Sequence, residues 1–140
     1  LVQVPWSPKG DIDLAAVPTD PTADHELSLY MEDTGWPHVP LDDYTGFWER
    51  VYLPLLQSTG RSRPRLLDIE AVFQPAYGAG RRPEAILMQK VVSHEGLLEL
   101  FRTETPPEMK QPGTFMHDAL QVRDQWESRL LRTSAWSPLY

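Results

Sequence analysis

The chain has 140 residues, of which 41% are hydrophobic and 24% are charged, with a formal net charge of −7. This size and composition predict a single globular core and exclude a wholly disordered chain. The acidic balance disfavours nucleic acid and anionic membranes as partners, the absence of cysteine excludes disulfides and zinc–thiolate sites, and no stretch reaches the ~20 apolar residues of a membrane span.

The beginning of the chain is rich in proline. We expect residues 1–24 to form an extended N-terminal arm, with a short extended piece from Leu1 to Trp6, and residues 25–140 to form the domain. The lack of cysteine is compatible with the cytoplasm, where we expect this protein.

Alternating side chains predict the first strand, from His25 to Met31. One side of this strand carries Leu27, Leu29 and Met31, and the other carries Ser28, Tyr30 and Glu32. The run from Asp33 to Pro37 ends the strand as a loop. Trp36 and His38 therefore lie in or next to a loop, where binding residues often gather.

Helical spacing predicts a helix from Leu41 to Gln57, in which Pro54 kinks or ends the last turn. Two strands, Leu66–Gln74 and Ala85–Val92, follow as a hairpin. We read the glycine-rich connection between them as a turn, because a phosphate-binding loop leads from a strand into a helix. In the first strand of the hairpin, Leu67, Ile69, Ala71 and Phe73 oppose Asp68, Glu70, Val72 and Gln74.

Two further helices are predicted in the C-terminal third. The first is Leu97–Arg102, with Ser93 as N-cap, and the second runs from a Thr114 cap to about Glu127. A final strand is expected at 130–136. On the last helix, Trp126 is expected in the core, His117 in solvent, and Arg123 either paired with a carboxylate or anion or extended toward water.

The order of elements predicts an α+β domain of the ferredoxin-like type, β-α-β-β-α(-β). Helices cover one face of such a sheet, and the other face must be buried by something else or stay wet. Two sheets packing face to face would make a dimeric α/β barrel, which buries that face and hides edge strands. The polar side chains expected on this face suit a partly polar cavity.

Several short runs resemble one family. They are Glu26-Leu27-Ser28-Leu29-Tyr30, Leu53-Pro54-Leu55-Leu56, Glu70-Ala71-Val72-Phe73 and the closing Leu130-Leu131-Arg132-Thr133-Ser134-Ala135-Trp136-Ser137-Pro138. Together they resemble the NIPSNAP-like branch of the dimeric α/β-barrel superfamily over about residues 25–138. The resemblance implies a homodimer and a small-molecule cavity, but it supplies no catalytic residues.

The expected site follows from the polar face. Glu70 or Glu32 would act as general base and Tyr30 as donor, with Gln89, Gln74, Trp36 and His38 contacting substrate. The alternative is that these side chains face water at the barrel mouth or pair across the dimer. No metal-binding spacing of histidines is present, and no cofactor is expected.

Two functions stay open. The first is a cofactor-free isomerase, cyclase or monooxygenase that acts on a hydrophobic carbonyl compound, in a biosynthetic pathway. The second is a non-catalytic dimeric module that binds a small molecule or a protein. The cost of a polar interior favours the enzyme.

Overall fold

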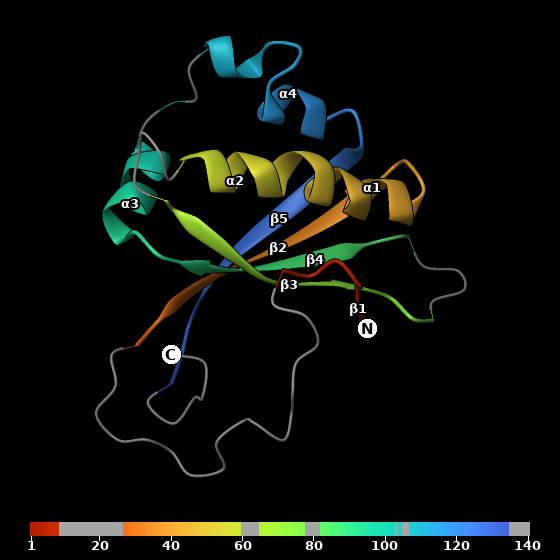
Figure 1. The fold of residues 1–140 in the computed structure, drawn as a ribbon, viewed down its shortest axis with the longest axis horizontal. Helices are drawn as coiled ribbons and strands as arrows, with labels where there is room; N and C mark the ends of the chain where they lie inside the picture. Colours follow the sequence, from red (N-terminus) through yellow and green to blue (C-terminus); the bar gives the residue numbers. More distant parts are fainter. Residues whose placement is uncertain (9–26, 60–64, 78–81, 103, 105–106, 135–140) are drawn as a thin grey trace.

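Five strands form one antiparallel sheet in the computed structural model (Figure 1), which describes residues 1–8, 27–59, 65–77, 82–102, 104 and 107–134. The strands are β1 Val2–Gln3, β2 Leu29–Pro37, β3 Leu67–Gln74, β4 Ala85–Val91 and β5 Arg123–Arg132. Their order in the sheet is β1-β3-β4-β2-β5. β2 and β3 both run antiparallel to β4, which lies between them. This split βαβ arrangement confirms the α+β prediction and is compatible with a ferredoxin-like fold.

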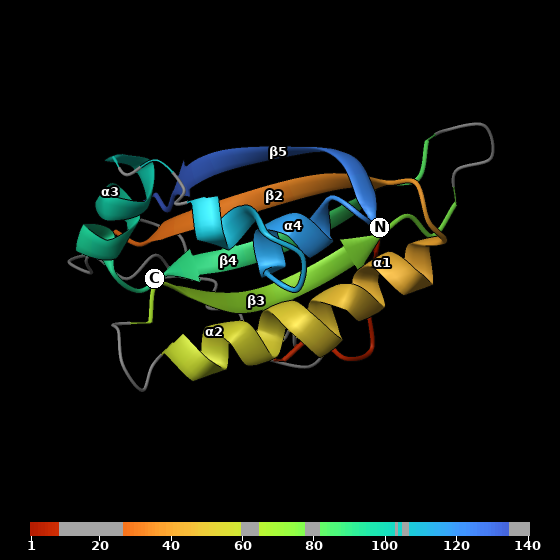
Figure 2. The same ribbon diagram turned by 90° about the horizontal axis from the view of Figure 1, so that it is seen from above.

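The helices lie on one side of the sheet (Figures 1 and 2). They are α1 Leu41–Phe47, the π turn η2 Trp48–Tyr52, α2 Leu53–Thr59, α3 His94–Arg102, the 3₁₀ turn η3 Pro107–Lys110 and α4 Phe115–Ala119. In the part of the chain that the structure describes, no helix covers the opposite side of the sheet, which we call the open face. None of the described helices is long and apolar enough to cross a membrane.

The long helix does not end at Pro54, although that residue was expected to kink or end it. α1, η2 and α2 follow one another without a break from Leu41 to Thr59. The π turn lies directly before α2, so the backbone is widened where the Pro54 ring meets the carbonyl of Arg50. This widening lets the helix continue past a residue that has no N–H to donate.

The covered face holds the hydrophobic core. Tyr44 and Trp48 are 0% and 2% exposed, and their ring centroids lie 4.5 Å apart. They pack with small and branched side chains of β3 and β4, which are Ile69, Val72, Ala85 and Leu87. Below α3, Leu97 packs with Met31, Leu67 and Val91 in a second cluster. Ser93 caps α3 as predicted, since its Oγ accepts a hydrogen bond from the Gly96 N–H at 3.1 Å.

A β-bulge at Glu70 changes which side chains of β3 face the helices. Ile69 lies opposite Gln89, whereas Ala71 lies opposite Met88, so β3 holds one residue more than β4 at this point. One extra residue inverts the alternation along the rest of a strand. The helix-facing residues of β3 are therefore Leu67, Ile69, Val72 and Gln74, whereas alternation alone predicts Ala71 and Phe73 in place of the last two.

The last predicted helix is largely a strand. α4 starts after the Thr114 cap as expected but ends at Ala119, and residues 123–132 form β5 against β2. Helix propensities differ by less than about 0.7 kcal/mol per residue, so a ladder of ten strand residues outweighs them. Trp126 is consequently 43% exposed on an edge strand and not in the core. The final strand was expected, but with later bounds.

The N-terminal segment belongs to the fold. Val2 and Gln3 pair with the end of β3, and the Val4 N–H donates to the Val72 carbonyl at 2.9 Å. Val4 is only 3% exposed. The extended piece predicted from Leu1 to Trp6 is confirmed at Val2–Gln3, but Pro5 and Trp6 lie in a turn. The rest of the predicted arm, from residue 9 on, lies outside the described residues.

Candidate functional site

The open face brings together side chains from four strands. Tyr30 on β2 lies opposite Lys90 on β4, which lies opposite Asp68 on β3. In the next row, Glu32 lies opposite Met88. The other residues of this face are Thr34, Trp36, Ala71, Phe73, Ile86, Glu127, Arg129 and Leu131. The face is therefore polar at the Tyr30 end and more apolar toward Ile86 and Phe73.

Tyr30 and Glu70, two of the three predicted catalytic residues, lie within electrostatic reach of each other. Tyr30 is 8% exposed. Burial raises the pKa of its hydroxyl, and the negative charge of Glu70 raises that pKa further. The hydroxyl therefore stays protonated over the physiological range and can donate a hydrogen bond.

Glu32, the third predicted catalytic residue, lies at the β2–β5 boundary. Its Oε1 is 3.4 Å from Nη1 of Arg129, and its side chain is 23% exposed. Nε of Arg129 also lies 2.9 Å from Oε1 of Glu127. An exposed pair of this length adds little stability, so the Glu32 carboxylate can exchange partners at low cost.

Gln89 does not lie with Tyr30, and that prediction is wrong. It lies opposite Met31 on the covered face and is 0% exposed. β4 starts at Ala85 as predicted, but its odd-numbered residues face the helices, which a mostly apolar run does not reveal. Lys90 takes the expected place of Gln89 on the open face. Gln74 is also on the covered side, because of the bulge at Glu70.

A buried polar network surrounds Gln89 between the sheet and the helices. Its Nε2 donates to Oδ2 of Asp33 at 2.7 Å, and its Oε1 accepts from the Tyr52 hydroxyl at 2.8 Å. The Ser128 hydroxyl donates to Oδ1 of Asp33. Burial raises the pKa of Asp33 most strongly, while the hydrogen bond from Ser128, the charge of Arg123 and the hydrogen bond from Gln89 oppose this rise.

Arg123 supplies the positive charge of this interior region. It is 9% exposed, and its guanidinium carbon lies 4.4 Å from the centroid of the Trp126 ring. Its charge lowers the pKa of Asp33 and Tyr44, although burial keeps the pKa of Tyr44 above its usual value. Of the two options open from the sequence, the structure favours the electrostatic role beside Asp33 over extension into water.

The sequence contained one signal for this network. Asp33 continues the helix-facing alternation of Leu29 and Met31, but its neighbours Thr34 and Gly35 favour a turn. Reading the strand to Pro37 would have placed a carboxylate on the buried face, where it requires partners.

Trp36 and His38 lie at the far end of β2. Trp36 is the penultimate residue of β2, opposite Gln125, and is not in the expected loop. His38 does follow the strand. Its Nδ1 lies 2.6 Å from Oδ1 of Asp124, and its Nε2 lies 2.9 Å from the Gln121 carbonyl oxygen. Nη2 of Arg82 lies 2.5 Å from Oδ2 of the same aspartate.

Both acceptors of His38 lack a proton, so both ring nitrogens must donate, which requires the imidazolium form. The hydrogen bond to Asp124 raises the pKa of His38, and the bond to the Gln121 carbonyl adds to this. We expect a titration followed by NMR to give His38 a pKa above the usual ~6.5. Any stability that the contact between His38 and Asp124 adds is fully present below the pKa of His38 in the unfolded chain. This stability is lost as the pH rises through the higher pKa of His38 in the folded state.

The matched variants are Asp124→Asn and Gln121→Ala. The first removes the carboxylate and should return the pKa toward its usual value. The second leaves the backbone carbonyl in place, so the raised pKa should persist. A raised pKa that survives Asp124→Asn would contradict this assignment.

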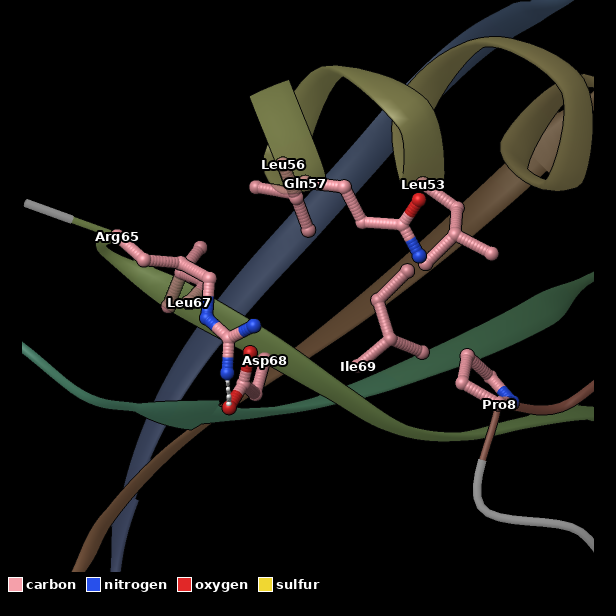
Figure 3. Close-up of a pocket in the computed structure, with 8 residues that line it drawn as sticks. All are labelled: Pro8, Leu53, Leu56, Gln57, Arg65, Leu67, Asp68 and Ile69. Carbon is pink, nitrogen blue, oxygen red and sulfur yellow. Dashed lines mark hydrogen bonds and ion pairs between the residues drawn. The ribbon is translucent and has the colours of Figure 1, made fainter. Parts of the chain in front are cut away.

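Two hollows lie at the margins of the sheet and reach the open face at one residue each, Asp68 in the first and Ile86 in the second. One, of about 210 Å³, lies between α2 and β3 (Figure 3), beside an ion pair in which Nη2 of Arg65 is 2.5 Å from Oδ2 of Asp68. Its lining residues are Pro8, Leu53, Leu56, Gln57, Arg65, Leu67, Asp68 and Ile69. The other, of about 490 Å³, adjoins the connection between β3 and β4. Neither is lined by Tyr30, Glu32 or Glu70.

The described residues contain no group of three or more His, Asp or Glu side chains that could hold a metal ion. His117 lies on α4, where its Nδ1 is 3.0 Å from Oδ1 of the adjacent Asp118. Both residues of this contact lie on α4, so the contact does not connect His117 with the open face.

Comparisons with known proteins add no assignment to this geometry: no family model, no curated protein and no solved structure matches the chain.

Proposed function

We propose that this chain is a subunit of a homodimer whose open faces pack toward each other and enclose a small-molecule chamber. The observation that carries the proposal is the composition of the open face, which joins Tyr30, Glu70 and Lys90 to the apolar Met88 and Ile86. Apolar side chains on a sheet face are more stable against a partner than in water. Polar groups gathered at one end of such a chamber would orient a substrate.

The proposal includes membership of the NIPSNAP-like branch of the dimeric α/β-barrel superfamily. The strand order and the short runs noted in the sequence support this assignment. The proposed substrate is a hydrophobic carbonyl compound of a cytoplasmic biosynthetic pathway, and the reaction needs no cofactor.

The proposed chemistry is proton abstraction next to a carbonyl group. Glu70 or Glu32 is the base, because either carboxylate can accept the proton that leaves the carbon next to the carbonyl group. Tyr30 donates to the enolate oxygen, a role that its raised pKa favours because the hydroxyl stays protonated. The Lys90 ammonium, opposite Tyr30, adds positive charge near the same oxygen.

Hydrogen–deuterium exchange tests this chemistry without knowledge of the product. A panel of aromatic and cyclic ketones is incubated with the protein in heavy water, and loss of the α-proton is followed by NMR. We expect Glu70→Gln to slow the exchange by about a hundredfold, because it removes a general base, and Tyr30→Phe by a similar factor.

Asp68→Asn is the matched control, because Asp68 is also a carboxylate of β3 on the open face but is held by Arg65. It should leave exchange unchanged. Equal rates in Glu70→Gln, Glu32→Gln and the parent chain would remove the enzyme proposal and leave the binding module.

Face-to-face association has its own test, by light scattering. Met88→Lys places a charge in the middle of the open face, opposite Glu32, and we expect it to halve the mass of the assembly, since burying a lysine costs more than burying a methionine even beside a carboxylate. Leu98→Lys is the control, because Leu98 is 52% exposed on α3, away from this face. An unchanged mass in Met88→Lys, with an unchanged circular dichroism spectrum, would contradict the packing.

A further inference from the structure

The outer edge of β5 is unoccupied within the described part of the chain. β5 is the last strand of the sheet, with ten residues, and Figure 2 shows it at the margin opposite α1 and α2. Nine of its ten residues are exposed. Trp126 is 43% exposed and Leu130 is 48% exposed. A long edge with unpaired backbone groups and exposed apolar side chains is a template for another strand.

The charges of β5 are self-complementary about Ser128. Two acidic residues, Asp124 and Glu127, precede Ser128 by four positions and one position, and two basic residues, Arg129 and Arg132, follow it by one and four. When two copies of this strand run antiparallel with Ser128 opposite Ser128, each Glu127 faces an Arg129. Asp124 lies at a bulge and already pairs with His38 and Arg82, so this charge match rests on Glu127 and Arg129. The apolar Trp126 and Leu130, two positions before and after the centre, then also face each other.

The backbone of β5 allows this register. Thr133 donates its N–H to the Ser28 carbonyl at 3.0 Å, so the odd-numbered residues of this strand bond to β2. The even-numbered residues direct N–H and C=O to the free edge. Pairing centred on Ser128 joins even-numbered residues only to even-numbered ones, so the outward-directed groups of Trp126, Ser128 and Leu130 find partners; the register changes at the bulge at Asp124.

We propose that β5 of one copy pairs with β5 of a second copy, antiparallel and centred on Ser128, to form a continuous ten-stranded sheet. Opposite charges that face each other across an antiparallel pair contribute roughly 0.2–1 kcal/mol each, and like charges destabilise it. The side chains of Glu127 and Arg129 are 48% and 59% exposed, so both can turn to a partner.

This interface goes beyond the proposed function. It requires open faces that pack as two layers with both β5 edges outside, because a fully closed barrel would cover those edges. The two-fold axis of an edge pairing stands normal to the sheet, whereas the axis that relates two packed open faces lies parallel to the sheet. Where two perpendicular axes of this kind cross, they generate a closed tetramer. We therefore expect four chains for the parent, two for Met88→Lys and two for any variant that breaks the edge.

Charge reversal tests the edge. Arg129→Glu places Glu127 opposite a glutamate, and Glu127→Arg places Arg129 opposite an arginine, so each variant alone should lose half the parent mass in light scattering. An equimolar mixture of the two variants restores opposite charges at both positions and should recover the parent mass. Recovery on mixing cannot come from misfolding.

A cysteine tests the register, because the chain contains none of its own. Ser128→Cys places two thiols opposite each other at a Cα separation of about 5.5 Å, which a disulfide spans. It should form a covalent dimer on oxidation, while Gln125→Cys, distant from its own copy in this register, should not. Unchanged mass in both charge variants, or no recovery on mixing, would overturn the edge pairing and leave the open-face proposal intact.

Discussion

Replacing Gln89 by Leu should lower the free energy of unfolding by about 3–5 kcal/mol, because two buried groups lose their partner at once. The Tyr52 hydroxyl would lose its acceptor, and the Asp33 carboxylate would lose one of its donors. Since Gln89 is 0% exposed, no water stands ready to replace these bonds. Urea unfolding followed by circular dichroism measures the loss, which is a large part of the 5–15 kcal/mol that stabilises most domains.

The double variant Gln89→Leu with Tyr52→Phe separates the two contributions. It removes the orphaned hydroxyl, so it should be more stable than Gln89→Leu alone by about 1–3 kcal/mol. The loss of stability that remains in the double variant measures the effect of removing the Gln89 hydrogen bond from Asp33. Because the pKa of Asp33 is raised in the folded state, that state holds the proton more tightly than the unfolded chain. Stability should thus fall as the pH rises through this range, and fall further in Gln89→Leu.

The second large effect is expected for Gly35→Ala. A methyl group on Gly35 would overlap the Tyr44 hydroxyl oxygen and lie 2.7 Å from Cζ of that ring. Tyr44 is 0% exposed and packs against the Trp48 ring at an interplanar angle of 54°, so it has little room to move. We expect a loss of about 1–3 kcal/mol from overpacking, measured as a lower midpoint of thermal unfolding.

Tyr44→Phe provides the control for this clash. No partner of the buried Tyr44 hydroxyl has good hydrogen-bond geometry within the described part of the chain, although Arg123 lies near enough to lower the pKa of that hydroxyl through a weak side-chain hydrogen bond and through its charge. Its removal should therefore be close to neutral. Gly35→Ala should cost less in the Tyr44→Phe background than in the parent, and equal costs in both backgrounds would show that the hydroxyl is not the obstacle.

Local sequence patterns predicted the helices and strands whose hydrophobic periodicity agrees with the structure that they adopt. The helix from Leu41, the hairpin and the Ser93 cap were found because spacing, turn residues and cap chemistry agree there. The segment 123–132 was missed because its residues are acceptable in a helix and become a strand only against the long edge of β2. No local signal reports the presence of such an edge.

Only part of the site was predicted, because the face of the sheet on which a strand residue lies depends on unbroken alternation along the strand. Tyr30 and Glu32 follow a regular alternation and lie on the open face as expected. Gln74 and Gln89 do not. The Glu70 bulge exchanges the faces at the end of β3, and β4 is apolar on both faces, so its sequence does not indicate which side meets the helices. A shift of one position exchanges the two faces of a strand, so a site built from strand side chains depends on details that composition does not encode.

The π turn from Trp48 to Tyr52 constrains how this helix can change. Such a turn has the form of an α-helix that has accepted one inserted residue. Deleting a residue there would regularise the backbone but rotate α2 by about 100° relative to α1. Leu53 and Leu56, which now pack against the core, would leave it together. Substitutions in the turn are therefore easier to accommodate than any change in its length, and related chains should keep a constant spacing between Tyr44 and Leu56.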